Sequence, residues 1–579
     1  MFLKYPSSYW GYNRKAPPQQ PNNPTDKERY ELVEYVLEST GRIEDFNNII
    51  KLLSPPINNN SPQLLGKLKG AKIGIIGGGL AGLSAAFELR KFGFDITIFE
   101  ALENHVGGRV YTHYFDEKKG LYGELGAMRV PASHETVWHY INLFKLSTKP
   151  FIQRNKNAFI YVQDERIRND LEGKNIKDKL YPLFHLEEWE RNMPWPKLNS
   201  YALERHLLNL PAAIRTEILK IKPKYNPLYL NLERFSIRKS MEVLGLSEGA
   251  INLIASIDPI TGSFLYNSYN EILQDIYPVN FAYLYRIEGG MSKLPLAFYE
   301  SLLSENPKEY DDIPNNLLGK VKWKGGNWVT GIYKYEKGGK VVLKYKSKSL
   351  KEDEKESFDY VICTIPFSTL RNIEINPLFT ERKMQAIREV NYSNSQKTLF
   401  LCDKRFWEEG DIDEKINGGI SYTDKVITTI VYPSDHAACD KSQENNFSTE
   451  EPGVLLASYN FTLDATRLGN TNSENRFQIV KEQVEEVHGL EKGALDSIVK
   501  EYVTREWDNE PWALGAFSMF YPGQKRIFLY DMEKPEYENR VFFAGEHISC
   551  NHAWMQGALQ SGIIAANMLI KVKSREVIH

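Results

Sequence analysis

A glycine-rich turn close to residue 80 constrains the fold of this chain more than any other feature. The short β-branched segment AKIGII (71–76) leads into the turn GGGLAG (77–82), an apolar stretch to residue 93 and the segment DITIFE (95–100). This order predicts strand, tight turn, helix and strand, the context in which GxGxxG binds a dinucleotide. Gly77 permits the turn, Gly79 lets the backbone approach a pyrophosphate, and Gly82 lets the helix pack closely on the strand.

Residues beside the turn complete the predicted dinucleotide site. Leu80 and Ala81 open the helix, so their amides and the positive end of the helix dipole face the phosphates. Glu100 ends the second strand, where its carboxylate can accept hydrogen bonds from ribose hydroxyls and disfavours a 2′-phosphate. The motif alone does not separate NAD from FAD.

Size and charge narrow the class of protein. The chain has 579 residues, more than one hydrophobic core usually serves, which predicts two or three domains. The 72 lysines and arginines nearly balance the 75 aspartates and glutamates, which argues against nucleic acid or an anionic membrane as a partner. The N-terminus lacks a signal-like apolar stretch, and no run reaches the length of a spanning helix, so a cytoplasmic protein is expected.

The cysteines give no sign of a metal centre or a disulfide framework. Cys363, Cys402, Cys439 and Cys550 are far apart and form no CxxC pair. We expect them to be buried thiols and predict no metal site.

Two segments resemble the flavin amine oxidase superfamily. Residues 107–110 (GGRV) look like its glycine-arginine turn, in which the residues matching Gly108 and Arg109 contact the flavin diphosphate. The segment VFFAGEHISCNHAWMQGALQSG (541–562) resembles its second flavin motif, in which the residue matching Glu546 binds the ribityl chain and a helix begins near Trp554. The resemblance therefore implies FAD, and it implies further cofactor contacts from Gly126, Ala127, Met128, Arg129, Val321, Gly545, Ala553, Trp554 and Met555.

The wide separation of these motifs predicts a discontinuous cofactor domain. The expected fold is α/β, with a Rossmann-like FAD-binding domain of the glutathione-reductase type, a mixed α+β substrate domain and a helical insert. We expect an N-terminal extension (1–69), an FAD-binding domain (70–115, 285–370 and 525–572), a substrate-binding domain (116–165 and 371–524) and a helical domain (166–284). Members that attach FAD covalently use a cysteine before the second motif; residues 512–517 (WALGAF) contain none, which predicts non-covalent FAD.

Within the superfamily, residues 122–129 (YGELGAMR) resemble the L-amino acid oxidases, which place an arginine beside the flavin. Arg129 would supply a fixed, always charged, bidentate partner for a substrate α-carboxylate. Monoamine and polyamine oxidases have no carboxylate to hold. A structural alternative is that Arg129 pairs with a protein carboxylate such as Glu124.

The resemblance assigns roles to four further residues. Tyr432 would make a second carboxylate contact, Trp554 would wall the substrate against the flavin, and the Ala553 carbonyl would accept from the substrate amine. Lys397 would hold a water near flavin N5 and place a cation where oxygen reacts. Tyr432 and Trp554 could each be core residues instead.

These residues imply FAD-dependent oxidative deamination of an L-amino acid by Cα hydride transfer to flavin N5, with reoxidation by O2. The products would be the 2-oxo acid, ammonia and hydrogen peroxide. Three alternatives stay open: an amide-forming, decarboxylating amino-acid 2-monooxygenase, a primary-amine or polyamine oxidase, and a flavin-binding protein without turnover. The partners would be a small amino acid and O2; family members often dimerise, so a homodimer is an expected assembly.

Overall fold

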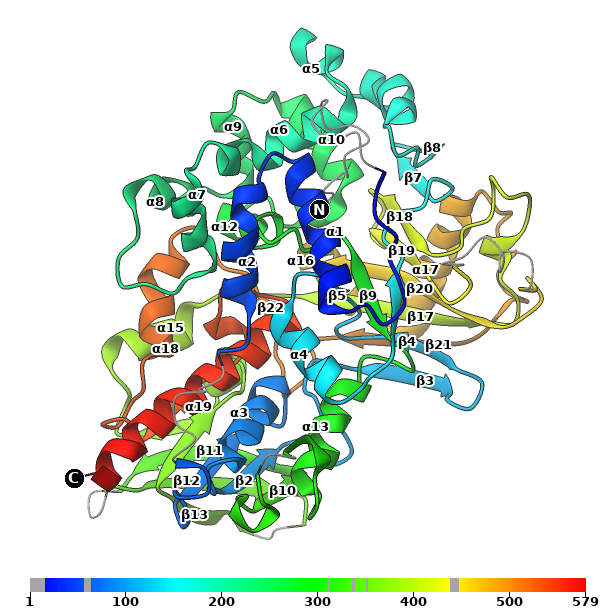
Figure 1. Ribbon diagram of the computed structural model, residues 1–579. Coiled ribbons are helices and arrows are strands. Elements are labelled where there is room, and N and C mark those ends of the chain that lie inside the picture. Colours follow the sequence, from blue (N-terminus) through cyan, green and yellow to red (C-terminus); the bar gives the residue numbers. More distant parts are fainter. Residues whose placement is uncertain are drawn as a thin grey trace.

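The computed structural model describes residues 16–56, 64–310, 313–335, 339–349, 352–437 and 447–578 (Figure 1). Its fold is mixed α/β, as predicted. The three cysteines within these ranges, Cys363, Cys402 and Cys550, are buried and free. The prediction for Cys439 lies outside the described residues.

A five-stranded parallel sheet carries the glycine-rich turn. Its strand order is β10-β2-β1-β14-β23, and the bounds are β1 Lys72–Ile76, β2 Asp95–Glu100, β10 Val321–Gly325, β14 Tyr360–Cys363 and β23 Val541–Phe543. Strands inside such a sheet are covered on both faces, and accordingly the last four residues of β1 and all residues of β14 are buried. The five strands come from all three segments of the predicted FAD-binding domain.

Two helices lie side by side against this sheet, α3 (Leu80–Arg90) and α19 (Met555–Ile578) (Figure 1). Their backbones approach so closely that a Cβ on Gly562 would lie 2.3 Å from the Ala81 carbonyl oxygen. Because Gly562 has no side chain, α19 can lie directly against α3, close to the glycine-rich turn.

A four-stranded sheet, in the order β13-β12-β11-β15, packs on the parallel sheet. Its bounds are β11 Asn327–Lys334, β12 Val341–Ser347, β13 Glu354–Phe358 and β15 Glu374–Asn376. The contact is close, since a Cβ on Gly74 of β1 would meet Leu343 and Phe358 at 3.0 Å.

A separate seven-stranded mixed sheet has the order β21-β17-β20-β19-β18-β7-β8. It lies at the upper right of Figure 1, whereas the parallel sheet lies at the bottom. Its bounds are β7 Phe159–Val162, β8 Glu165–Arg168, β17 Ser395–Cys402, β18 Gly419–Thr423, β19 Thr429–Tyr432, β20 Gly453–Phe461 and β21 Val499–Glu506. One face packs on α17 (Ser473–His488) around a second, smaller hydrophobic core. The other side contributes to the large core shared with the rest of the molecule.

Helices dominate residues 188–276, within the region that the sequence predicts to be helical. They are α5 Glu188–Asn192, α6 Trp195–Leu208, α7 Ala212–Arg215, α8 Pro227–Glu233, α9 Ile237–Val243, α10 Glu248–Ile257, α11 Pro259–Ser263 and α12 Tyr269–Ile276. Ser236, Ser247 and Ser268 cap the starts of α9, α10 and α12 with their hydroxyls. The predicted helical segment begins at residue 166, and there the structure has strand β8 instead.

The remaining elements connect these parts. They are β3 Thr112–Asp116, β4 Leu121–Glu124, β5 Val130–Pro131, α4 Glu135–Leu143, β6 Thr148–Phe151, β9 Leu284–Ile287, α13 Lys293–Leu303, α14 Phe367–Leu370, α15 Glu381–Glu389, β16 Tyr392–Ser393, α16 Thr462–Gly469, β22 Phe517–Ser518 and α18 Tyr530–Glu533.

The N-terminal extension contains two helices that pack into the molecule, α1 (Asp26–Ser39) and α2 (Phe46–Leu53). Thr25 and Glu28 form a capping box at the start of α1. The buried Arg29 guanidinium lies 2.5 Å from the Glu135 carboxylate and also donates to the Ala132 carbonyl. This segment is therefore part of the core.

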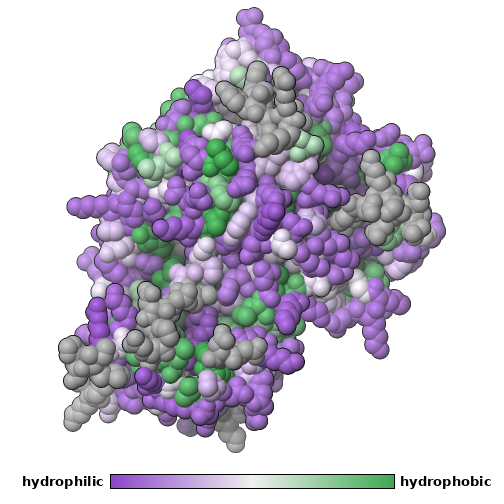
Figure 2. Space-filling view, in the orientation of Figure 1, coloured by the Kyte–Doolittle hydropathy of each residue, from purple (hydrophilic) through white to green (hydrophobic). Residues whose placement is uncertain are grey.

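Polar side chains cover most of the face in Figure 2, and the apolar ones lie in small groups. Among the described residues, no helix combines the length and the apolar character that crossing a bilayer requires.

Candidate active site

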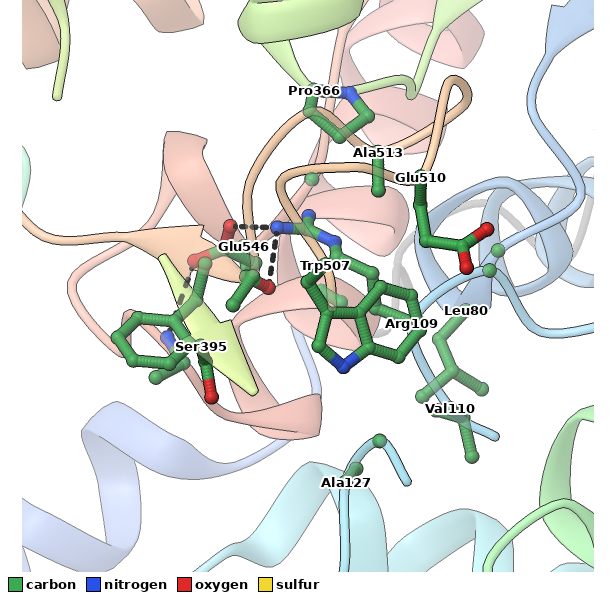
Figure 3. A pocket seen from close by; sticks show the side chains of 18 of the residues that line it. Leu80, Arg109, Val110, Ala127, Pro366, Ser395, Trp507, Glu510, Ala513 and Glu546 are labelled. Atoms are coloured by element: carbon green, nitrogen blue, oxygen red, sulfur yellow. Dashed lines mark hydrogen bonds and ion pairs between the residues drawn. The ribbon is translucent and has the colours of Figure 1, made fainter. Parts of the chain in front are cut away.

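One cavity of about 500 Å³ runs from the glycine-rich turn to the seven-stranded sheet (Figure 3). It gathers segments from residue 76 to residue 558. Of the predicted site residues, it brings together Gly77, Gly79, Leu80, Ala81, Glu100, Gly108, Arg109, Gly126, Ala127, Met128, Arg129, Lys397, Gly545, Glu546, Ala553, Trp554 and Met555.

Gly79 leaves open space at the start of α3. Its φ of −77° suits any residue, and a Cβ there would have no heavy atom of the protein nearer than 3.9 Å. The protein's own packing therefore does not require glycine at this position, whereas a phosphate approaching the backbone does. Gly82 differs, because its Cβ would lie 2.1 Å from the Gly77 carbonyl oxygen. It does not line the cavity and serves the packing of helix on strand, as predicted.

Glu100 lies at the end of β2 beside this turn. Its carboxylate accepts hydrogen bonds from the amides of Gly78 (2.8 Å) and Leu102 (2.9 Å). Burial raises its pKa. The carboxylate is thus fixed in orientation where it lines the cavity, beside the glycine-rich turn.

Arg109 and Glu546 join the two predicted flavin motifs across 437 positions of sequence. The Arg109 guanidinium lies 2.8 Å from the Glu546 carboxylate and donates to the Ala516 carbonyl (Figure 3). Glu546 also accepts from the Ser518 amide and hydroxyl and from the Ala553 amide. Burial acts against ionisation, but Arg109 and nearby imidazoles hold the pKa of Glu546 at about 2. The pair is charged at any physiological pH.

Arg129 projects into the cavity among aromatic rings. Its Cζ lies 5.2 Å from the Phe281 ring centroid and 6.0 Å from that of Trp554, and Nη1 donates to Gln153 (3.0 Å). Within the described chain, no carboxylate forms an ion pair with Arg129. Burial lowers its pKa, yet a guanidinium stays protonated in proteins.

Glu124, the alternative partner for Arg129, is engaged elsewhere. It accepts from the Thr112 hydroxyl (2.9 Å) and the Met291 amide (2.8 Å), and burial raises its pKa to about 7. The structure therefore does not support the alternative that Glu124 neutralises Arg129.

Lys397 lies on β17 with its amine inside the cavity. It donates to the carbonyls of Gly126 (2.7 Å) and Glu124 (3.2 Å), and Nζ is 4.3 Å from the Tyr459 ring centroid. Burial, followed by the charge of Arg129, lowers the pKa of Lys397 to about 7. At neutral pH this amine can therefore both donate and accept a proton.

Trp554 precedes α19 and forms one wall of the cavity. Its indole Nε1 donates to Asp275 Oδ1 (2.7 Å), and its ring packs against Phe281 with the centroids 5.5 Å apart. Ala553 has a left-handed φ of 64°, which turns the backbone here. These contacts fix the indole as one wall of the cavity.

The structure places two predicted residues elsewhere. The Tyr432 hydroxyl forms hydrogen bonds with Ser421 (2.7 Å) and His488 (2.9 Å) in the second hydrophobic core, and it does not line the cavity. The predicted carboxylate contact is therefore wrong for Tyr432. Tyr459 lines the cavity instead; burial raises the pKa of its phenol, and the charge of Arg129 partly opposes this shift.

Val321, the first residue of β10, pairs with Ile96 of β2 and is not a cavity residue. Its predicted cofactor contact is also wrong. Val329, on β11, the next strand along the chain, lines the cavity. In both cases a residue of the same type on another strand lines the cavity: Tyr459 in place of Tyr432, and Val329 in place of Val321.

Several cavity residues carry no motif and were not predicted. They are Asp275, Phe264, Phe461, Trp507 and Phe517. Phe461 packs on Phe264 and Phe517 with centroids 5.2 and 6.0 Å apart, so these three rings form an apolar wall. Of these residues, only Phe461 and Phe517 lie on strands, where a strand-like pattern in the sequence could have indicated them.

This arrangement fits FAD. The open cradle at Gly79, the carboxylate at Glu100 and the Arg109–Glu546 pair match a pyrophosphate, a ribose and a ribityl chain, respectively. The described residues lining the cavity include no cysteine, so the site offers no thiol for covalent attachment.

Fold and site together define an FAD-dependent oxidoreductase with a discontinuous Rossmann-like domain. The sequence profile described as flavin containing amine oxidoreductase matches residues 80–570, and the chain belongs to this family. FAD is accordingly its cofactor.

Proteins similar to this chain include amino-acid oxidases. An L-amino-acid oxidase of Vipera ammodytes ammodytes is 30% identical over 85% of this chain and 91% of its own length. One from Siganus canaliculatus is 29% identical over 86% of this chain and 85% of its own, and a putative L-amino-acid oxidase of Bacillus subtilis is 30% identical over 85% and 93%. Wild-type putrescine oxidase bound to putrescine has a similar fold, with a TM-score of 0.61, 18% identity and coverage of 86% and 99%.

Proposed function

We propose that this flavoprotein catalyses the oxidative deamination of an L-amino acid to the 2-oxo acid, ammonia and hydrogen peroxide. The observation that carries the proposal is the Arg129 guanidinium, which projects into the cavity beside Trp554 with no carboxylate of the described chain paired to it. A charged group in a partly dry site is costly unless a ligand completes it. A substrate α-carboxylate is the matching group.

The chain's own residues would bind and orient the substrate. Arg129 holds the carboxylate, and the Tyr459 phenol supplies a second contact. Trp554 restricts the substrate on one side, and the Ala553 carbonyl accepts from the amine. Fixed orientation and exclusion of water would supply much of the rate.

When bound, FAD would accept the hydride of the Cα–H bond, which carries both electrons of the oxidation. Lys397 lies across the cavity, held by two carbonyls, and can position a water. Its cationic form stabilises negative charge that develops on dioxygen.

Substitution of Arg129 tests the proposal. Arg129→Ala removes a charge-assisted pair worth about 2–4 kcal/mol, so KM for the preferred amino acid should rise roughly 30- to 1,000-fold. Arg129→Lys keeps the charge but loses the bidentate fork and should be intermediate. Steady-state oxygen consumption measures both effects.

The decarboxylated amine of the same substrate is the matched control, since its turnover should not depend on Arg129. An unchanged KM in Arg129→Ala, or an amine oxidised better than its amino acid, would contradict the assignment. The second outcome would support the amine-oxidase alternative.

The monooxygenase alternative shares the same binding residues. Analysis of the products separates the two, because it finds either 2-oxo acid with peroxide or amide with carbon dioxide. The homodimer, the cytoplasmic location and the domain boundaries stay predictions.

A further inference from the structure

The cavity holds one carboxylate whose surroundings differ from those of the others. Glu546 pairs with Arg109 at 2.8 Å, and Glu271 pairs with His552 at 2.8 Å. The other engaged carboxylates are Glu510 with Arg505 and Glu100 with backbone amides. Asp275 also lines the cavity, but within the described chain no lysine, arginine or histidine nitrogen forms an ion pair with it.

Neutral groups hold the Asp275 carboxylate in place. Its Oδ1 accepts from the Trp554 indole at 2.7 Å and from the Asn280 amide at 3.0 Å. Burial raises its pKa to about 6. The carboxylate is therefore mostly ionised at neutral pH, where a cation entering the cavity would stabilise it.

Asp275 and Arg129 lie at the same aromatic wall. The Trp554 indole donates to Asp275, and the Arg129 Cζ is 6.0 Å from the Trp554 ring centroid. Phe281 packs on Trp554 and lies 5.2 Å from the same Cζ. An amino acid with its α-carboxylate on Arg129 can thus extend an apolar stem over these rings while its far end reaches the second charge.

We infer that Asp275 selects substrates whose side chain ends in a cation, such as lysine or ornithine. The inference rests on the proposed amino-acid oxidation. The methylene stem packs on Trp554 and Phe281, and the terminal ammonium donates to the Asp275 carboxylate. An apolar side chain of equal length leaves that carboxylate desolvated and without a cationic partner, so it binds less well.

Lysine and norleucine separate these cases in the wild-type holoenzyme, because norleucine keeps the stem and lacks the ammonium. Anaerobic bleaching of the flavin, followed by stopped flow, gives kcat/KM for reduction by each. We expect lysine to exceed norleucine by roughly 10- to 100-fold, the effect of one hydrogen bond to a charged group. A ratio of one or below overturns the inference.

Asp275→Asn keeps an acceptor for the Trp554 indole and removes the charge. The lysine-to-norleucine ratio should fall by roughly 10- to 100-fold in this variant. Glu510→Gln, which alters a cavity carboxylate already paired with Arg505, is the matched control and should keep the wild-type ratio. Equal losses for both substrates in Asp275→Asn would show that Asp275 only positions Trp554, which also overturns the inference.

The two proposals fail in different ways. If none of the twenty amino acids bleaches the flavin, the amino-acid oxidation itself is wrong. If leucine or phenylalanine bleaches it faster than lysine does, the oxidation stands and the role of Asp275 is wrong; the aromatic wall around Phe461 would then set the preference.

Discussion

Single residues decide the chemistry of this site, and the two tyrosines show how. Tyr459 is the cross-strand partner of Lys397 in the β17–β20 pair, so both side chains reach the same face of the sheet and the same cavity. Tyr432 lies on the adjacent strand β19, and its phenol enters the core beneath α17. Side chains alternate between faces along a strand, so a shift of one position moves a side chain to the opposite face.

Tyr459→Phe should weaken substrate binding, because it removes the second donor to the carboxylate. One hydrogen bond to a charged group corresponds to a rise in KM of roughly 10- to 100-fold. Steady-state kinetics with the preferred amino acid measures it.

Tyr432→Phe is the matched control. It loses the hydrogen bonds with Ser421 and His488 and should lower the free energy of unfolding by about 1–2 kcal/mol while KM stays the same. If KM rises in Tyr432→Phe and not in Tyr459→Phe, the sequence-based assignment was right and ours is wrong.

At the scale of elements, local motifs were predictable and pairings between strands were not. The turn from Gly77 to Gly82 is encoded in consecutive residues, so its strand and helix follow from the sequence alone. Asp275 and Phe264 lie in the helical region without any motif, and only the packing of that region brings them into the cavity. Val321 and Val329 are equally apolar, and the strand order separates them.

Substitution of two glycines of the turn by alanine should have different effects. Gly79→Ala adds a methyl group where the protein is open, so the apoprotein should keep its stability while the affinity for FAD falls. Gly82→Ala places a Cβ 2.1 Å from the Gly77 carbonyl oxygen, so the apoprotein itself should lose about 1–3 kcal/mol or more.

Thermal unfolding of the apoproteins and fluorescence titration with FAD measure the two effects. The roles assigned to the glycines are incorrect if Gly79→Ala destabilises the apoprotein as much as Gly82→Ala does.

At the scale of the whole molecule, the N-terminal extension is tied into the core through buried contacts. Arg42 is buried and donates to the carbonyls of Ile276 and Tyr277, which follow directly after Asp275 on the chain. From the sequence, this segment is predicted only as an extension (1–69), because its partners lie more than a hundred positions away.

Arg29→Met should lower stability strongly. It leaves the Glu135 carboxylate buried without its cation, and the loss of one member of such a pair costs about 3–5 kcal/mol. Lys27→Met, which removes an exposed pair with Glu31 on the same helix, should cost less than about 0.5 kcal/mol.

The thermal midpoints of the Arg29→Met and Lys27→Met holoenzymes, recorded at one scan rate, measure the difference in stability. Equal midpoints would mean that α1 contributes little to the folded core.

The parallel sheet closes late in synthesis. Its edge strand β23 begins at Val541, and Glu546 and α19 follow, whereas the glycine-rich turn leaves the ribosome hundreds of residues earlier. The site that binds the nucleotide therefore stays incomplete until Glu546 has been translated. A chain truncated before Val541 would lack β23, Glu546 and α19, and we expect it not to retain FAD.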